Sequence, residues 1–441
     1  MATQHRKCGL ILSVNAGSSS LKISFFSLSD QSGNTQGDHE PVTLLLTSSI
    51  SNLSSPPAKF SFDCPSLGNK GVKEEDVSSI KDHASAFAHF LGCLKEEAGI
   101  DRDEIVHVCH RVVHGGDYTD PVIISNESYH HIEKLSDLAP LHNGSALSVI
   151  KACFEALPNA NSIAYFDTAF HRSIPPHIAS YAIDQDVAKK RGLKKYGFHG
   201  LSYAFILRSV AKHLDKPPTS LNLIILHLGS GASVCAIKNG LSLDTSMGLT
   251  PLNGLPGATR SGAIDPSLIF HYTNKAGKIS HDPKLARQLH VTEAEDILNT
   301  KSGWKSITGT TNFGEIISKA DLSSVPSSDN PHRLAFDLFT DRITGYVGSY
   351  YVKLNGRVDA LVFSGGIGEH GRELREAVAK AVECLGFGMV DAGRNADDNV
   401  KKEGIVVDIG IDGMDKRILI CKTDEQVEMA RECALADKFW G

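Results

Sequence analysis

Three short segments rich in glycine and serine are the part of this sequence best suited to chemistry. They span residues 15–22, 227–233 and 364–370. Glycine and serine leave backbone N–H groups open, and successive N–H groups in a tight turn bind anions. In the first segment the hydroxyls of Ser18 and Ser20 add donors, and Lys22 adds a positive charge. The spacing differs from a P-loop because no second glycine precedes Lys22. We interpret the segments as phosphate-binding turns. The alternative is a flexible polar hairpin turn for the first segment and simple tight packing for the third.

Charged side chains stand at the ends of predicted strands and in one long loop. Arg111 stands near the end of a strand that reads as buried, and its planar guanidinium suits carboxylate or phosphate. Asp167 ends another strand, and His199 stands between two glycines before a predicted helix. Arg260 lies in a loop dense in glycine and proline, and such loops are often functional. The structural alternative for each residue is an ordinary ion pair or a loop hydrogen bond.

Anion-binding turns, positioned cations and an acid together form the inventory that phosphoryl transfer needs. Its transition state spreads negative charge over the oxygens of the transferred group, so positioned cations and donors supply most of the catalysis. Magnesium in such sites uses few protein oxygens, because phosphates and water complete its shell. The residues therefore indicate a phosphotransferase or a nucleotide hydrolase.

The composition excludes several other classes of protein. With 45 Lys and Arg against 51 Asp and Glu the net charge is −6, which argues against broad nucleic-acid binding. No apolar run approaches the ~20 residues that span a bilayer, and no signal peptide is recognisable. The nine scattered cysteines never occur as C-x-x-C, which indicates reduced thiols and no zinc site. We therefore expect a cytoplasmic protein that binds neither nucleic acid nor membrane.

The elements that must position these side chains alternate between strands and helices. Strands are predicted at 9–14, 21–28, 106–113, 162–166, 221–228, 232–237, 359–363 and 417–421. Helices are predicted at 80–97, 145–156, 201–213, 266–275, 294–299, 333–354, 373–385 and 425–438. We interpret 29–59 as a surface excursion with one short strand at 42–46, and 63–75 as a polar break. The alternation over the whole length predicts an α/β protein of 441 residues in more than one domain.

The first two glycine-rich turns suggest an internal duplication. Each interrupts two strand-like runs, one pair near the start of the chain and the other in its middle. Two such loops indicate two related halves with a cleft between them.

The order of these motifs resembles that of the acetate kinases, within the superfamily that also holds sugar kinases and actin. The matching blocks, in chain order, are 15–22, 110–116, 166–171, 196–202, 244–266, 366–369 and 423–425. The resemblance implies two duplicated actin-like (ribonuclease H-like) domains, with mixed sheets flanked by helices around a central cleft. It implies an acyl and phosphate domain at 1–167 with a helix at 426–441, and a nucleotide-binding domain at 168–425.

The resemblance also implies an activity. Members transfer the terminal phosphoryl group of ATP to acetate, reversibly and in line, giving acetyl phosphate and ADP. They use Mg²⁺ or Mn²⁺ and are usually homodimers. We expect the same reaction, cation and assembly here.

Roles for single residues follow from the matched blocks. Arg111 would bind the substrate carboxylate, and His199 and Arg260 would stabilise the phosphoryl group in flight, with His142 close to it. Asp167 matches the family's essential acid and is expected to orient a cation such as Arg111. The apolar pocket for the acetate methyl would consist of Val113, Leu141, Phe198 and Pro251.

The cation and the nucleotide have matched residues too. Asn15 and Glu425 correspond to the magnesium site. The nucleotide-binding residues would be Ser18, Ser20, Lys22, His227, Leu228, Gly229, Ser230, Gly231, Asn312, Phe313, Gly314, Gly366, Ile367, Gly368, Glu369 and His370.

The sequence departs from the family pattern at the nucleotide end. Ser230 and His370 stand where asparagine is usual, and Asn312 and Gly314 stand where the family carries aspartate and arginine. Because some members use pyrophosphate and inorganic phosphate in place of ATP and ADP, that donor is one alternative. The other is an actin-like nucleotide switch with no acyl acceptor.

Overall fold

The chain forms two compact units in a computed structural model. The first consists of Met1–Ala169 with Asp424–Gly441, and the second of Phe170–Thr423. These spans lie close to the domains expected from the sequence, 1–167 with 426–441 and 168–425. The structure describes residues 7, 9–17, 19–29, 40–53, 57–65, 71–135, 140–278, 291–396, 400 and 404–440, without the side chains of 140–142.

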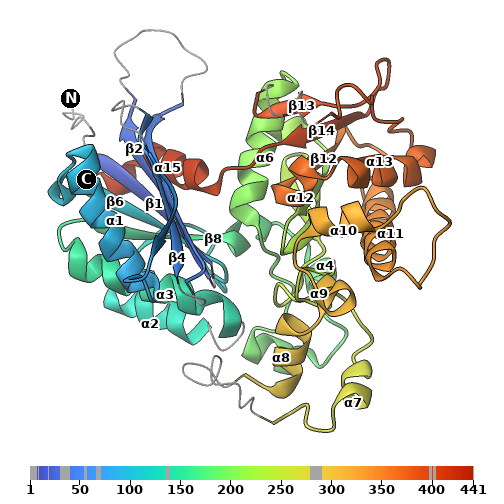
Figure 1. Ribbon diagram of the computed structural model, residues 1–441, viewed down its shortest axis with the longest axis horizontal. Helices are drawn as coiled ribbons and strands as arrows, with labels where there is room; N and C mark the ends of the chain where they lie inside the picture. The colour runs from blue at the N-terminus through green and yellow to red at the C-terminus, as the bar shows by residue number, and fades with distance from the viewer. Residues whose placement is uncertain are drawn as a thin grey trace. The chain divides into compact units, whose positions relative to one another are not determined.

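An eight-stranded sheet forms the centre of the first unit (Figure 1). Its strands are β1 (Leu10–Gly17), β2 (Ser20–Leu28), β3 (Val42–Ser51), β4 (Ala58–Asp63), β5 (Val72–Val77), β6 (Ile105–Val112), β7 (Val122–Ile123) and β8 (Asn161–Phe166). They lie in the order β5-β4-β3-β2-β1-β6-β8-β7. The hairpin β1–β2 is antiparallel, whereas β1 pairs in parallel with β6, and β6 with β8.

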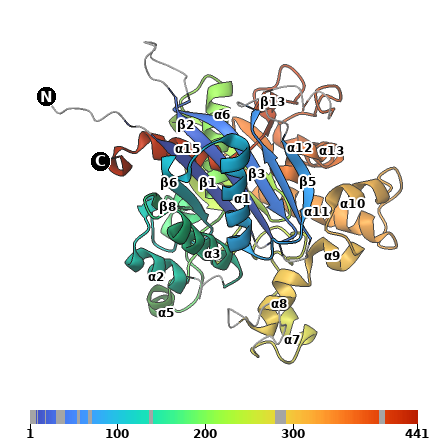
Figure 2. The same ribbon diagram turned by 60° about the vertical axis from the view of Figure 1, so that its left-hand side comes forward.

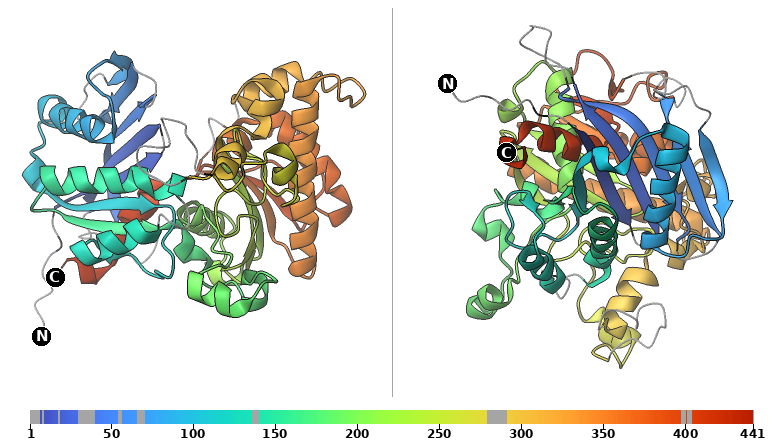
Figure 3. Two further views of the ribbon diagram at one scale, coloured as in Figure 1. Left: turned by 90° about the horizontal axis from the view of Figure 1, so that it is seen from below. Right: turned by 90° about the vertical axis from the view of Figure 1, so that its left-hand side faces the viewer.

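Helices cover both faces of this sheet. They are α1 (His83–Ala98), α2 (Asn126–Leu135), α3 (Pro140–Ala156) and α15 (Glu425–Leu435). Helix α1 lies across the sheet in Figure 2, and its Phe87 and Phe90 share a core with Leu12. The C-terminal helix α15 packs against β1, β2, β3 and β6, where its red ribbon lies beside the blue strands (Figure 3). Successive side chains of β1 point to opposite faces, so cover on both faces leaves Ile11 and Leu12 equally buried.

The predicted strand at 42–46 is present but twice as long as expected, and residues 30–39 of the predicted surface excursion lie outside the described residues. Strand β3 runs over ten residues, and β4 and β5 extend the sheet beyond it. Thr47, Ser49 and Ser51 of β3 alternate with the buried Leu46, Ser48 and Ile50, so one face of the strand lies on the core. The predicted polar break at 63–75 contains much of β5, an edge strand whose Glu74, Glu75 and Asp76 are exposed. Charged residues suit an edge because they discourage further pairing.

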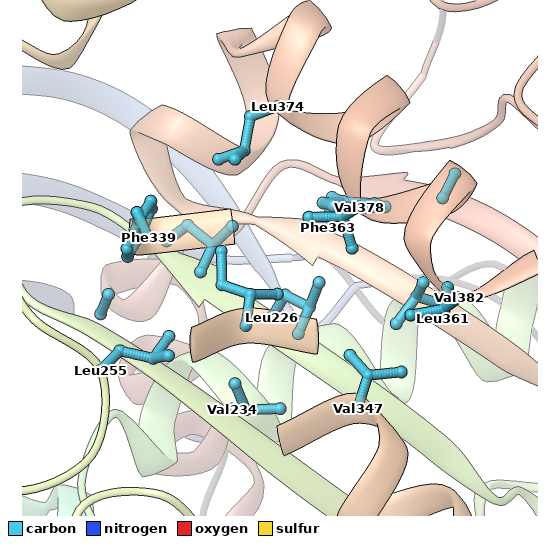
Figure 4. Packing of buried hydrophobic residues seen from close by; sticks show 14 of the residues in the cluster. Leu226, Val234, Leu255, Phe339, Val347, Leu361, Phe363, Leu374, Val378 and Val382 are labelled. Atoms are coloured by element: carbon cyan, nitrogen blue, oxygen red, sulfur yellow. The ribbon is translucent and has the colours of Figure 1, made fainter. Parts of the chain in front are cut away.

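The second unit contains a six-stranded sheet. Its strands are β9 (Leu223–Leu228), β10 (Ala232–Lys238), β11 (Leu241–Thr245), β12 (Ala360–Ser364), β13 (Val406–Asp408) and β14 (Arg417–Cys421), in the order β11-β10-β9-β12-β14-β13. Its helices are α4 (Pro176–Ala179), α5 (Gln185–Arg191), α6 (Gly200–His213), α7 (Leu268–Tyr272), α8 (Glu293–Thr300), α9 (Gly303–Thr308), α10 (Phe313–Lys319), α11 (Pro331–Lys353), α12 (Gly365–His370) and α13 (Arg372–Ala381). Leu226 and Phe363 of the sheet pack with Phe339, Val347 and Val378 from α11 and α13 (Figure 4).

The two sheets share one topology. The order β3-β2-β1-β6-β8-β7 in the first unit repeats as β11-β10-β9-β12-β14-β13 in the second. Each pair also keeps its direction, for β9 is antiparallel to β10 and parallel to β12, as β1 is to β2 and β6. The prediction of an α/β protein with two duplicated mixed sheets is confirmed. No described helix is long and apolar enough to cross a membrane.

Candidate active site

The hairpin β1–β2 carries the first glycine-rich turn. Asn15 and the exposed Lys22 are direct partners in its register, so their side chains leave the same face of the hairpin. The carbonyl of Gly17 is 2.8 Å from the His83 Nε2 atom of α1, which fixes the tip of the hairpin. Ser18 lies outside the described residues. The predicted role of Ser20 and Lys22 in nucleotide binding stays a prediction.

Arg111 is the centre of an ion-pair cluster in the first unit. Its Nε and Nη2 atoms donate to Asp167 Oδ2 over 3.1 and 2.7 Å. Its Nη1 atom is 2.8 Å from Glu425 Oε2 and donates to Asn15 Oδ1 over 3.3 Å. Asn15 Nδ2 in turn donates to Glu425 Oε2 over 2.7 Å. Four residues that the sequence singled out, scattered between positions 15 and 425, therefore touch one another.

The fold explains why these residues meet. Strands β1, β6 and β8 are mutually parallel neighbours, so the residues at their carboxyl ends share one edge of the sheet. Asn15 lies near the end of β1, Arg111 near the end of β6, and Asp167 directly after β8. Glu425 is the first residue of α15, which packs on the same strands.

The cluster carries more negative than positive charge. The Arg111 side chain is 16% exposed, and that of Asp167 is fully buried. Burial by itself would lower the pKa of Arg111, but the charges of Asp167 and Glu425 outweigh it and raise the pKa. Two carboxylates against one guanidinium leave a net charge of −1, which a bound cation can balance.

In the second unit, the second and third glycine-rich segments lie next to each other. Strand β12 pairs with β9 so that Ser364 is opposite His227, at the base of the turn between β9 and β10. Gly365 has φ +74°, and a Cβ atom there would stand 2.7 Å from the carbonyl oxygen of Leu228. Only glycine allows this approach, which brings the segment at Gly366–His370 beside the turn at His227–Gly231.

Contacts at both the backbone and the ring fix the position of His199. Its φ of +59° is unusual for a residue with a side chain. The preceding carbonyl, of Phe198, is 3.0 Å from His171 Nε2, and His171 Nδ1 is 2.8 Å from Ser242 Oγ. Burial lowers the pKa of His171 to about 4, so this ring is neutral at pH 7. The imidazole of His199 is 4.2 Å, centroid to centroid, from that of His227.

Arg260 reaches the same turn from the long loop. The loop is tied to the turn because Ala258 N donates to the carbonyl of Ser230 over 2.8 Å. A Cβ atom on Gly231 would stand 3.1 Å from Arg260 Nη1 and 3.8 Å from His199 Nε2. The bare glycine therefore lets the guanidinium and the imidazole approach one point of the second glycine-rich turn.

The charge of Arg260 is not neutralised by protein. Among the residues that the structure describes, no carboxylate forms an ion pair with it and no acceptor takes its hydrogen bonds. Burial lowers the pKa of this guanidinium from its ordinary value. A buried cation without a counter-ion is costly unless an anion binds it, so the site is suited to a phosphate group.

Arg375 secures the third segment, and sequence reasoning missed it. This fully buried residue of α13 donates from Nη1 to the carbonyls of Gly368 and Glu369, over 3.0 and 2.8 Å. Its Nε atom donates to Asn395 Oδ1 over 2.6 Å. Its place in the predicted helix at 373–385 gave no signal of this role, because a single arginine on a helix looks like a solvated charge. Glu369 Oε1 accepts from Gly365 N over 3.1 Å, and burial raises the pKa of this carboxyl.

Several predicted nucleotide contacts have structural partners of their own. Asn312 Oδ1 caps α10 by accepting from the backbone N–H groups of Gly314 and Glu315, over 3.0 and 3.3 Å. Phe313 is buried against Trp304 and Phe339. The predicted contact of this segment with a nucleotide stays a prediction.

The predicted apolar pocket for the acetate methyl is not assembled within either unit. Val113 follows β6 in the first unit, whereas the buried Phe198 and Pro251 belong to the second. The side chains of Leu141 and His142 lie outside the described part of the structure. The pocket stays a prediction.

Comparison with known proteins identifies the family of this chain. Residues 10–431 match the Acetokinase family. A probable acetate kinase from Emericella nidulans is 51% identical over 431 residues, which cover 96% of this chain and 97% of that protein. The acetate kinase of Bacillus cereus is 38% identical over 428 residues, with 96% and 97% covered.

Solved structures agree with the sequence comparison. A propionate kinase from Francisella tularensis aligns with a TM-score of 0.79 at 32% identity, covering 96% of this chain and 98% of that one. An acetate kinase from Porphyromonas gingivalis aligns with a TM-score of 0.75 at 30% identity, with the same coverage. By its motifs, its duplicated topology and its full-length relatives, the chain belongs to the acetokinase family.

Proposed function

We propose that this protein is an acetate kinase that transfers the terminal phosphoryl group of ATP to acetate, reversibly, giving acetyl phosphate and ADP. The observation that carries the proposal is the buried Arg260 guanidinium, which has no protein counter-ion among the described residues and stands with His199 at the second glycine-rich turn. Full-length relatives named acetate kinase support the choice of acetate as acceptor.

Arg111 is the proposed partner of the acetate carboxylate. Asp167 holds the Nε and Nη2 atoms of the guanidinium and fixes its plane, while Nη1 contacts Glu425 and Asn15. A substrate carboxylate would share the Nη1 and Nη2 donors with these protein groups. Asp167 is thereby an orienting group. It has no proton to abstract, because acetate at neutral pH is already ionised and nucleophilic.

The transfer itself is a displacement at phosphorus. A carboxylate oxygen of acetate attacks the γ-phosphorus of ATP, the bond from that phosphorus to the β,γ-bridging oxygen breaks, and the electron pair leaves on ADP. His199 and Arg260 stabilise the charge on the oxygens of the phosphoryl group as it moves. His142 is a further candidate for this role.

Asn15 and Glu425 are the proposed ligands of a divalent cation. Their amide and carboxylate oxygens are hard donors of the kind that Mg²⁺ and Mn²⁺ prefer, and Mg²⁺ is usually bound by one or two protein groups plus phosphates. The net charge of −1 in their cluster also suits a cation. When bound, the cation would neutralise charge on the phosphate chain.

The remaining assignments concern the nucleotide and the assembly. We propose that the phosphates of ATP bind the turn at His227–Gly231 and the segment at Gly366–His370, with Ser18, Ser20, Lys22 and the backbone of Asn312–Gly314 as further contacts. On this proposal the first unit binds the acyl group and the second the nucleotide. We further propose a cytoplasmic homodimer.

A hydroxylamine trap for acetyl phosphate tests the proposal. We expect acetohydroxamate from acetate, ATP and Mg²⁺, and none when ATP is replaced by pyrophosphate. Hydroxamate with pyrophosphate alone would instead support the pyrophosphate-dependent alternative. Nucleotide binding without hydroxamate from either donor would leave the actin-like switch.

A further inference from the structure

We propose that Tyr203 and Ser233 are positioning residues that form a hydrogen-bonded relay to His199 and keep its Nε2–H directed at the second glycine-rich turn. The inference deepens the proposed function, because it rests on the proposed contact between His199 and the phosphoryl group. It gives a role to the buried hydroxyls of Tyr203 and Ser233, which do not otherwise take part in the proposed phosphoryl transfer.

The relay runs through three side chains of the second unit. Tyr203 lies one turn after His199 along α6, and Ser233 lies near the start of β10. Both are fully buried. Ser233 Oγ is 2.5 Å from the Tyr203 hydroxyl oxygen and 2.8 Å from His199 Nδ1, so the serine hydroxyl joins the phenol to the imidazole.

The acidities of the groups set the direction of donation. A phenol is far more acidic than a serine hydroxyl and is the stronger donor, so Tyr203 donates to Ser233 Oγ. The serine hydrogen is then directed to His199 Nδ1, which accepts it. A neutral imidazole that accepts at Nδ1 carries its proton on Nε2. The relay therefore selects one of the two tautomers.

The selected nitrogen is the one that faces the turn. His199 Nε2 is 3.8 Å from the position that a Cβ atom of Gly231 would take, and Arg260 Nη1 approaches the same position. An Nε2–H group there donates to an anion, whereas a bare Nε2 lone pair would repel one. The tautomer thus decides whether His199 helps or opposes binding of a phosphoryl oxygen.

The same unit contains a second histidine held in this way. His171 Nδ1 is 2.8 Å from the Ser242 hydroxyl, and its Nε2 is 3.0 Å from the carbonyl of Phe198, which can only accept. His171 therefore carries its proton on Nε2, with serine donating to Nδ1. It provides an internal reference for the arrangement proposed at His199.

Histidine-selective ¹⁵N NMR of the full chain without substrates tests the relay directly. The His199 signals are assigned by their loss in His199→Gln. We expect a protonated Nε2 and an unprotonated Nδ1 in the unaltered protein, and a mixture of tautomers in Ser233→Ala and Tyr203→Phe. Tyr350→Phe is the matched control, because Tyr350 is a buried tyrosine of the same unit whose hydroxyl has no hydrogen-bond partner in the described structure. Its spectrum should not change.

Kinetics of acetyl phosphate formation provide the second readout. Loss of an oriented hydrogen bond of this kind should lower kcat about tenfold in Ser233→Ala and Tyr203→Phe, with the KM of acetate within about twofold. The control variant should keep both constants. A wild-type His199 protonated on Nδ1, or an unchanged tautomer in Ser233→Ala, would overturn the relay. Absence of acetyl phosphate synthesis by the unaltered protein would overturn the proposed function instead, while the NMR result would still decide the relay.

Discussion

Arg260 lies so close to Gly231 that a Cβ atom on this glycine would press on the guanidinium. The Nη1 atom is 3.1 Å from the position of a Cβ atom there, which is tighter than an ordinary contact. The φ angle of Gly231 is not positive, so its backbone would accept alanine. The constraint on this position therefore comes from the guanidinium beside it and not from a backbone conformation that needs glycine.

Gly231→Ala should consequently impair catalysis without unfolding the protein. The methyl group would displace Arg260 Nη1 by a few tenths of an ångström, and a misplaced cation loses its preference for the transition state. We expect kcat to fall about tenfold to a hundredfold, with the melting temperature unchanged. Gly92→Ala, in open space on the exposed face of α1, is the control and should keep full activity. If Gly231→Ala were as active as Gly92→Ala, the close approach of Arg260 to Gly231 would not matter for catalysis.

Removal of the Arg260 charge should act mainly on turnover. Because the guanidinium stabilises charge that develops during transfer, Arg260→Ala should lower kcat about a thousandfold while ADP affinity changes much less. Steady-state kinetics and calorimetric titration with ADP measure the two effects. Arg342→Ala removes an exposed arginine of the same unit and should have no effect on either. A parallel loss of ADP affinity and turnover would assign Arg260 to ground-state binding.

Asp167 should affect the acetate end through Arg111. Asp167→Asn retains the shape of the side chain but removes the charge that holds the guanidinium over 2.7 Å. Breaking a buried ion pair costs about 2–5 kcal/mol, part of which should emerge as an acetate KM raised at least tenfold. Arg111→Leu should raise the same constant further. An unchanged acetate KM in Asp167→Asn, together with a lower melting temperature, would make the pair purely structural.

Acid should destabilise the protein through its buried histidines. Burial lowers the pKa of His107 to about 4, of His110 to about 3 and of His171 to about 4, from an ordinary 6.5. Between these values and 6.5 the unfolded chain binds protons that the folded chain does not, so unfolding takes up protons and stability falls as the pH falls. At pH 5 the loss is about 2 kcal/mol for each histidine.

His107→Phe tests this origin of acid sensitivity. Neither ring nitrogen of His107 has a hydrogen-bond partner among the described residues, and the ring packs edge-on against Trp440. Phenylalanine keeps that packing and removes one titrating group, so the melting temperature should be retained at pH 7 and fall less steeply toward pH 5. His130→Gln, on the exposed surface of α2, should not change how steeply the melting temperature falls with pH. If the melting temperature of His107→Phe falls as steeply with pH as that of the unaltered protein, the buried imidazole is not the source of the acid sensitivity.

Sequence reasoning singled out candidate side chains that the structure brings into contact, but not the residues that hold them in place. Asn15, Arg111 and Asp167 could be found because strand ends and glycine turns leave a pattern in the sequence. Arg375 could not be recognised as the residue that secures Gly368 and Glu369, because a single arginine on a helix looks like any solvated charge. Ser233 gives no signal either, since its role depends on which side chain lies across the turn.

The errors in the fold have a similar cause. Strand β3 is rich in Ser and Thr and so has the composition of a loop. The alternation of Thr47, Ser49 and Ser51 with the buried Leu46, Ser48 and Ile50 becomes visible only when the core is known. The charged strand β5 likewise depends on its neighbour β4 for its backbone hydrogen bonds. Tertiary pairing overrides local preference at such edges.

The return of α15 to the first unit has a consequence for how the protein is made. Asn15 bonds to Glu425 across 410 positions of the sequence, and Ser13 bonds to the carbonyl of Gln426 across 413. A chain emerging from the ribosome can build most of the β1–β8 sheet early, but one face of β1 stays uncovered and the Arg111 cluster stays incomplete until the last helix arrives. Until then a nascent chain would hold a bare apolar strand that attracts chaperones, and truncated products would be inert.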